Sequence, residues 1–251
     1  MNFYGLTDKG RLRRQNQDFL FASDVPVGGL PNLFMVADGM GGHNAGEVAS
    51  EVAVNEMLER LREEENPEPV AALSDAVAFA NAKVYEEAGS DPAKAGMGTT
   101  LVCAVLRGRH LTVLNIGDSR LYLAGSDSIR QISRDHSVVE ELIRRGALSE
   151  EEAQFHRDRH KITRAVGAES TVRPDFFEVE LTGSPEEAIL LCSDGLTNEL
   201  SDEELYSIIE GKGTTKEKVR TLIATANGRR GADNVTALLL FPFSETDEVD
   251  V

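Results

Sequence analysis

The chain has 251 residues and a formal net charge of −17, from 26 basic and 43 acidic residues. This length suits one large domain or two small ones, and the acidic surface disfavours nucleic acid and anionic membrane as partners. The longest apolar runs are strand-sized, well below the roughly 20 residues of a membrane span, and the N-terminus lacks the layout of a secretory signal. We therefore expect a cytoplasmic protein.

The first third of the chain predicts strands followed by helices. Short apolar segments at 3–7, 18–24 and 32–38 are bounded by polar or Gly- and Pro-containing stretches, as strands are. Residues 45–66 and 69–89 carry apolar side chains at helical spacing, so each predicts a helix with one face on a core.

The rest of the chain returns to strands. Residues 98–125 predict three antiparallel strands, and the polar stretch 135–165, with a capping box at Ser149 and Glu152, predicts an inserted helical flap. The segments that follow are strands at 175–181 and 188–194, helices at 201–211 and 216–228, and a last strand at 234–241. The acidic tail, 243–251, is expected to be disordered.

Strands grouped together, with helices grouped between them, favour the α+β class over alternating βαβ units. There is enough strand for two sheets facing each other, with helices on their outer faces. Cys103 and Cys192 both lie inside apolar runs, which predicts small buried side chains rather than a disulfide or a metal pair.

Acidic side chains recur where apolar runs begin or end. The five aspartates at such positions are Asp18, Asp38, Asp118, Asp194 and Asp233. Taken singly, an Asp-Gly pair is more often a turn than a site. If the five share one rim, their repulsion is about 4 kcal/mol per pair at about 4 Å and an effective dielectric of about 20. Protonation or a cation would offset it, and oxygen ligands favour Mg²⁺ or Mn²⁺.

An ordered set of motifs bears on this choice. From about residue 4 to 240 the chain carries, in order, TDKGRLRRQNQD, VADGMGGH, GMGTTL, NIGDSRLYL, RDHS, ITRAVG, LLCSDGLTN and ADNVTALLL. The set resembles that of the metal-dependent protein phosphatases (the PPM family), and most closely the bacterial serine/threonine phosphatases of type 2C. The resemblance implies a β-sandwich of two antiparallel sheets flanked by pairs of antiparallel helices, forming a single catalytic domain over residues 1–242 with a small helical flap.

The resemblance also implies a metal site, motif by motif. Asp38 would bridge two divalent ions, Mn²⁺ or Mg²⁺. Asp194 and Asp233 would complete the first ion's site, and the carbonyl of Gly39 would help to bind the second. Asp18 would act through a metal-bound water.

A third, weaker ion site would use Asp118 together with Asp194. The implied reaction is direct attack by a water held between the two core ions on phosphoserine or phosphothreonine in proteins, with no covalent intermediate. The implied partners are phosphorylated proteins, including a serine/threonine kinase and its substrates, and nothing in the sequence suggests an obligate dimer, so we expect a monomer.

Arg13 stands at the family's phosphate-binding position, where a guanidinium can hold two phosphate oxygens at once. Without the motif it would be read as a solvated arginine between Arg11 and Arg14. Met40 stands where animal members carry a histidine proposed as general acid, and the nearest histidine is His43. His43 has two roles that we weigh evenly: the general acid, or a structural hydrogen bond at the start of a helix.

Two further sets of residues have more than one interpretation. His156 and His160 have the spacing of a zinc helix, but the charged flanks and the missing glutamate favour a solvated flap segment. Thr163 and Arg164 border the flap and would either touch substrate or pack. The rival functions are a non-catalytic binding module that kept the fold, which the metal aspartates argue against, and a metal phosphohydrolase of small phosphate esters.

Overall fold

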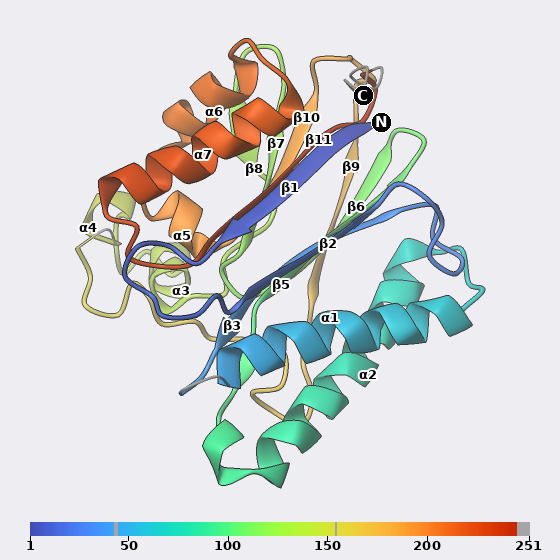
Figure 1. Ribbon diagram of the computed structural model, residues 1–251, viewed down its shortest axis with the longest axis vertical. Coiled ribbons are helices and arrows are strands. Elements are labelled where there is room, and N and C mark those ends of the chain that lie inside the picture. Colours follow the sequence, from blue (N-terminus) through green and yellow to red (C-terminus); the bar gives the residue numbers. More distant parts are fainter. Residues whose placement is uncertain (43–44, 154, 245–251) are drawn as a thin grey trace.

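The computed structural model describes residues 1–42, 45–153 and 155–244. Its strands form two antiparallel sheets that face each other (Figure 1). The order in the first sheet is β1 (Asn2–Asp8), β11 (Val235–Phe241), β10 (Ala188–Cys192), β7 (Arg120–Ala124), β8 (Ile129–Gln131). The order in the second is β2 (Asp18–Ser23), β3 (Leu33–Met40), β5 (Leu101–Arg107), β6 (His110–Ile116), β9 (Asp175–Glu180), with β4 (Gly98–Thr99) on β3.

The strands are apolar on both faces because each sheet packs on both sides. In β3, Phe34 and Val36 point between the sheets, while Leu33, Met35 and Ala37 point to the helices outside. This follows from the two-residue period of a strand, which sends successive side chains to opposite faces. The α+β sandwich that the sequence predicts is therefore confirmed.

A pair of helices covers each outer face (Figure 1). The pair α1 (Ala45–Glu63) and α2 (Pro69–Ser90) packs on the second sheet, and the pair α6 (Asp202–Glu210) and α7 (Thr215–Arg229) packs on the first. Both helices of the second pair begin with a capping box. In α6 the Ser201 side chain accepts from the Glu204 amide, and the Glu204 side chain accepts from the Ser201 amide. A short 3₁₀ helix, η1 (Pro92–Lys94), follows α2.

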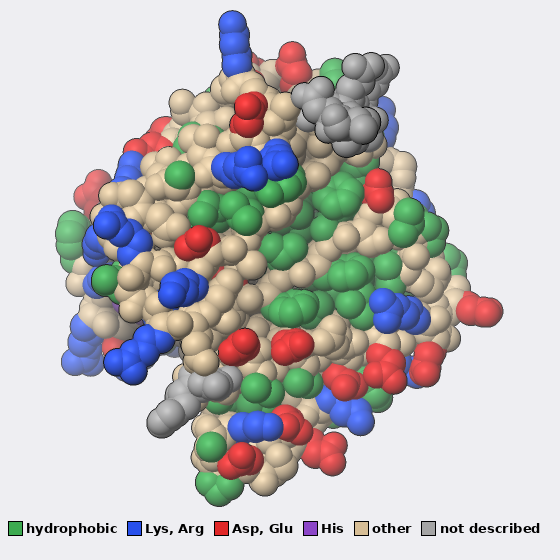
Figure 2. All heavy atoms as spheres, in the orientation of Figure 1, with side chains coloured by type: hydrophobic (Ala, Val, Ile, Leu, Met, Phe, Trp, Pro, Cys, Tyr) green, Lys and Arg blue, Asp and Glu red, His purple; other side chains and the backbone are tan. Residues whose placement is uncertain are grey.

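The edge strands β1 and β2 lie at the open side of the sandwich. On this face, hydrophobic side chains gather between the two sheets, as Figure 2 shows. Phe3 and Leu20 are partly buried there and pack on the core between the sheets.

One prediction about pairing is wrong. Residues 98–125 do contain successive strands, but only β5 and β6 pair, and β7 pairs with β10 and β8 in the other sheet. The chain crosses between sheets at Gly117, whose φ of +96° is in the region that favours glycine, and any side chain there would lie 2.6 Å from Cγ2 of Thr100. Asp118 follows directly, in the connection between β6 and β7.

The turn interpretation of the Asp38-Gly39 pair is also wrong. Strand β3 continues to Met40, and Gly39 pairs with Thr99 of β4. Asp38 therefore lies inside a strand, two residues before its end. Both cysteines are free and buried, as predicted.

The stretch between β8 and β9 holds two short helices, α3 (Val138–Arg144) and α4 (Glu150–Ala153). The predicted capping box at Ser149 is formed, with the Ser149 amide donating to the Glu152 carboxylate at 2.9 Å and the Glu152 amide to the Ser149 hydroxyl at 3.2 Å. Most of the acidic tail, 245–251, lies outside the described residues. None of the helices in the described part of the chain has the length and apolar composition that crossing a membrane requires.

Candidate active site

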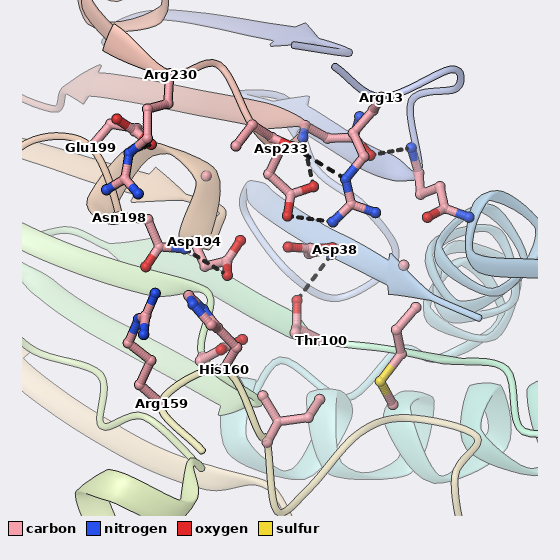
Figure 3. Close-up of a pocket in the computed structure, with 18 of the residues that line it drawn as sticks. Arg13, Asp38, Thr100, Arg159, His160, Asp194, Asn198, Glu199, Arg230 and Asp233 are labelled. Atoms are coloured by element: carbon pink, nitrogen blue, oxygen red, sulfur yellow. Dashed lines mark hydrogen bonds and ion pairs between the residues drawn. The ribbon is translucent and has the colours of Figure 1, made fainter. Parts of the chain in front are cut away.

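The aspartates of the motifs come from both sheets and meet at one end of the sandwich. Asp18 and Asp38 are register partners in neighbouring strands of the second sheet. Asp194 begins α5 (Asp194–Thr197) just after β10, and Asp233 precedes β11 in the first sheet. Asp38, Asp194 and Asp233, together with Asp118 from the connection between β6 and β7, line a hollow of about 510 Å³ (Figure 3), and Asp18 is buried behind it.

Close backbone packing explains two of the glycines that follow motif aspartates. A Cβ on Gly39 would lie 1.9 Å from the carbonyl oxygen of Gly46 in α1, and a Cβ on Gly195 would lie 1.9 Å from the carbonyl oxygen of Asn234. Either clash would push α1 or β11 away from the site. These glycines therefore position the aspartates through chain packing.

Thr100 holds Asp38 in place. Its hydroxyl accepts a hydrogen bond from the Asp38 amide at 2.9 Å, its own amide donates to the Asp38 carbonyl at 2.9 Å, and Ser119 contacts the hydroxyl at 2.7 Å (Figure 3). Both sides of the Asp38 backbone are thus bonded, which fixes the direction of its carboxylate.

The carboxylates raise one another's pKa values. Burial and four neighbouring carboxylates hold the pKa of Asp38 well above its usual range. Burial raises the pKa of Asp18 to about 7 and that of Asp118 to about 8, and the charge of Asp194 adds to both. Burial and Asp233 also raise the pKa of Asp194. Such a cluster is unfavourable when ionised, so it favours a counter-charge.

Asp18 is buried and only half satisfied. One carboxylate oxygen, Oδ2, accepts hydrogen bonds from Ser193 at 2.7 Å and Thr236 at 2.6 Å. The other, Oδ1, is buried without a hydrogen-bond partner. A buried carboxylate oxygen left in this way is costly unless a water or a cation meets it.

Asp233 is compensated by Arg13. The guanidinium donates from Nη2 to Oδ2 of Asp233 at 2.7 Å, and the other oxygen, Oδ1, accepts from the Asn234 amide at 2.8 Å. In Figure 3 the side chain of Arg13 reaches from the N-terminal loop toward Asp38 and Asp233. The predicted phosphate-binding arginine therefore lies beside the carboxylate cluster.

The donor set fits a hard divalent cation. It consists of carboxylates, one with an unpartnered buried oxygen, and their clustered charge raises their pKa values. Within the described residues, no three side chains of His, Cys, Asp or Glu already stand as ligands around one point. The predicted trio of Asp38, Asp194 and Asp233 is therefore not arranged as a ready ligand set in the described residues, and one oxygen of Asp233 pairs with Arg13.

Comparison with known proteins assigns the family. The model for protein phosphatase 2C matches residues 4–235. The chain belongs to the protein phosphatase 2C family. It is 39% identical over 242 residues to the serine/threonine phosphatase stp of Listeria innocua, with 93% of each chain covered. The metal-dependent PPM phosphatases suggested by the motifs are therefore the correct family.

Solved structures agree with this assignment. Serine/threonine phosphatase Stp1 from Staphylococcus aureus superposes with a TM-score of 0.86 at 34% identity, covering 94% of this chain and 93% of that one. The catalytic domain of the phosphatase PstP, in complex with 2 manganese ions, gives 0.82 at 32% identity, covering 95% and 96%. The protein is thus a protein phosphatase 2C that hydrolyses phosphoserine and phosphothreonine in a metal-dependent reaction, and its metals are Mn²⁺ or Mg²⁺.

The phosphatase pocket also contains residues that sequence reasoning missed. Arg159 and His160 from the stretch after α4 line it, as do Asn198 and Arg230 (Figure 3). His160 is exposed, as expected of a solvated flap segment, but its place at the edge of the catalytic pocket was not predicted. Asn198 donates to the Asp194 carboxylate at 2.9 Å. Asn198 ends the LLCSDGLTN motif, but Arg159, His160 and Arg230 stand in no quoted motif, so only their proximity in the fold reveals them.

His43, the predicted general acid, lies outside the described residues.

Proposed function

We propose that the aspartate cluster holds the catalytic metals of this phosphatase and that Arg13 binds the phosphate of the substrate. In this scheme Asp38 serves two ions, Asp194 and Asp233 serve the first, and the Gly39 carbonyl serves the second. Asp18 acts through water, and Asp118 serves a third ion with Asp194. The observation that supports the scheme is the convergence of five carboxylates from both sheets beside one guanidinium.

The role of each residue in hydrolysis follows from its chemistry. A bound divalent cation supplies a water nucleophile at neutral pH and offsets negative charge on the phosphoryl group. Arg13 holds and orients the phosphate through two parallel donors, which its half-exposed position beside Asp233 allows. Asp18, through its unpartnered oxygen, orients a water, and Ser193 and Thr236 keep that carboxylate in place.

The wider setting follows from this activity. We propose that residues 1–242 act as one catalytic domain in the cytoplasm, as a monomer, with residues 135–165 as a flap beside the pocket. Arg159 and His160, which line that pocket, support the flap assignment. The proposed partners are phosphorylated proteins that include a serine/threonine kinase and its substrates, and His43 is proposed as general acid.

The test is phosphate release from a phosphothreonine peptide, with Mn²⁺ and with EDTA. Asp194→Ala should abolish the Mn²⁺-dependent release. Arg13→Ala should lower kcat/KM by roughly 10- to 150-fold, because a hydrogen bond to a charged group contributes about 1.5–3 kcal/mol. Arg14→Ala, which removes an exposed neighbour, is the matched control and should change nothing.

Unchanged turnover in Arg13→Ala would reject the phosphate assignment. Hydrolysis of small phosphate esters together with no hydrolysis of any phosphopeptide would favour the small-ester phosphohydrolase instead.

A further inference from the structure

A second hollow, of about 460 Å³, opens beside the catalytic pocket. Met40 and Ile162 line both hollows, so the two are continuous. We call the second hollow the flank groove. Its remaining wall comes from the loop before β9, including Ala168, Thr171 and Val172. A peptide whose phosphorylated residue enters the catalytic pocket can extend along this wall.

The backbone of this wall is firmly anchored. Val166 and Thr99 exchange backbone hydrogen bonds at 2.8 and 3.0 Å. The side chain of Asn81, in α2, accepts from the Gly167 amide at 2.8 Å and donates to the Glu169 carbonyl at 3.0 Å. Asn81 is almost fully buried, so these bonds are shielded from water. The flank groove is therefore preformed, as specific ligand sites usually are.

The end of the groove nearest the catalytic pocket is fixed in the same way. The Thr163 amide donates to the His136 carbonyl at 2.7 Å, and Ile162 forms a bridge with Ser137. Ile162 is thus held where the two hollows meet.

The charges in the groove do not select a charged ligand. Arg164 donates to the Asp175 carboxylate at 2.7 Å and to the Arg173 carbonyl at 3.3 Å, so its charge is compensated within the protein. Arg164 thus forms a structural ion pair at the wall of the groove. The exposed Arg173 and Glu169 at the margin carry opposite charges. What remains for recognition is the aliphatic surface of Ile162 and Val172.

We propose that the flank groove receives an aliphatic side chain that directly neighbours the phosphorylated serine or threonine of the substrate. The inference rests on the proposed binding of the phosphate at Arg13. The occupant is a segment of the phosphoprotein because the groove is continuous with the pocket where that protein reacts. An aliphatic side chain buries apolar surface there, and glycine buries none.

The test compares phosphothreonine peptides that differ only in one neighbour of the phosphothreonine, leucine or glycine, before it or after it. With Mn²⁺, kcat/KM should be about 10-fold higher for leucine at one of the two positions, mainly through KM, as expected of a small apolar pocket. The variant Ala168→Trp fills the groove and should bring this ratio close to one. Its turnover of p-nitrophenyl phosphate, which has no neighbouring residue, should stay at the wild-type rate.

Ala224→Trp is the matched control, because Ala224 is exposed on α7 in the opposite helix layer and should leave the ratio unchanged. Thr171→Trp fills the groove from another position and serves if Ala168→Trp fails to fold. Equal kcat/KM for leucine and glycine at both positions in the wild type would overturn the inference. So would a preference that survives both groove variants.

The proposed function and the groove are rejected by different results. If Arg13→Ala leaves the turnover of the glycine peptide unchanged, the phosphate site is wrong, whereas full turnover without a leucine preference rejects only the groove.

Discussion

Two groups of charged side chains lie at the same end of the sandwich and differ in how their charges are compensated. The first is the aspartate cluster. The second, which we call the flap-base cluster, consists of Arg120, Asp135, His136, Arg164 and Asp175. In the aspartate cluster, the charges that act on Asp38 are those of other carboxylates, and its pKa is raised.

The flap-base cluster is neutralised from within. Asp135 accepts from Nε and Nη2 of Arg120 at 3.0 and 2.7 Å, and from Gln131 at 2.8 Å. Burial alone would raise the pKa of Asp175, but hydrogen bonds from Arg164 and His136 lower it below its usual value. The difference shows that the protein supplies cations for its structural carboxylates, whereas in the aspartate cluster only Asp233 has an arginine partner and the other carboxylates are left to an external ion. Three predictions test this contrast.

The largest effect is expected from Asp38→Asn. Phosphopeptide turnover should fall by at least about 100-fold, as is usual when one electrostatic contact of a catalytic centre is lost. In EDTA at neutral pH the variant should nevertheless be more stable than wild type, by about 1 kcal/mol, because the asparagine neither brings a repelling charge into the cluster nor has to take up a proton on folding. Urea unfolding with EDTA and with Mn²⁺ measures this, and Mn²⁺ should stabilise only the wild type strongly.

The control is Asp24→Asn, which removes an exposed carboxylate at the end of β2 opposite to Asp18 and should behave as wild type. Lower stability of Asp38→Asn in EDTA would contradict the view that the cluster is unfavourable without an ion.

Asp135→Asn should have the opposite consequence for stability. It leaves the guanidinium of Arg120 partly buried against Tyr122 without its carboxylate, and breaking a buried pair costs about 3–5 kcal/mol. Because this pair keeps some exposure, we expect about 2 kcal/mol, or roughly 4–8 °C in Tm. Asp75→Asn is the matched control: its carboxylate pairs with Arg60 at 2.6 Å on the surface, where the loss should stay below about 1 kcal/mol.

If Asp135→Asn and Asp75→Asn lost equal stability, the flap-base cluster would stabilise the fold no more than a surface ion pair does.

Local patterns in the sequence were sufficient to predict the helices and strands and most of the aspartate cluster. Helical spacing predicted α1 and α2 within three residues at each end, and the capping box at Ser201 marked the start of α6. Both signals act over a few neighbouring residues, so the sequence carries them directly. The aspartates were found because each stands beside a strand or inside one.

Contacts between distant segments were not predictable in this way. The crossing of the chain from β6 to β7 depends on the backbone of Gly117 and on its fit against Thr100. His160 and Arg230 enter the pocket from loops without regular period, and the pairing of Arg13 with Asp233 joins residues at opposite ends of the chain. Such contacts depend on how the two sheets pack.

The smallest expected effect concerns His136 of the flap-base cluster. The ring is buried, and this burial lowers the pKa of His136 from its ordinary value. Its Nδ1 accepts from the Gly117 amide at 3.2 Å, so the neutral ring carries its proton on Nε2, where Asp175 lies at 3.2 Å and Arg164 at 3.2 Å. Asp175 and Asp135 act to raise the pKa of His136, but burial outweighs them, so the folded protein binds a proton here less readily than the unfolded chain.

The sign of the pH dependence follows from this difference. Below the ordinary histidine pKa of 6.5 the unfolded state binds the extra proton, so stability should fall as the pH drops from 7 toward 5. In His136→Gln this part of the fall should be missing, a difference on the order of 1 kcal/mol between the two urea series. The slope of stability against pH is the decisive quantity, because the substitution also removes contacts and so changes stability at every pH. Parallel curves for wild type and variant would mean that the neighbouring carboxylates stabilise the charged ring as much as burial disfavours it.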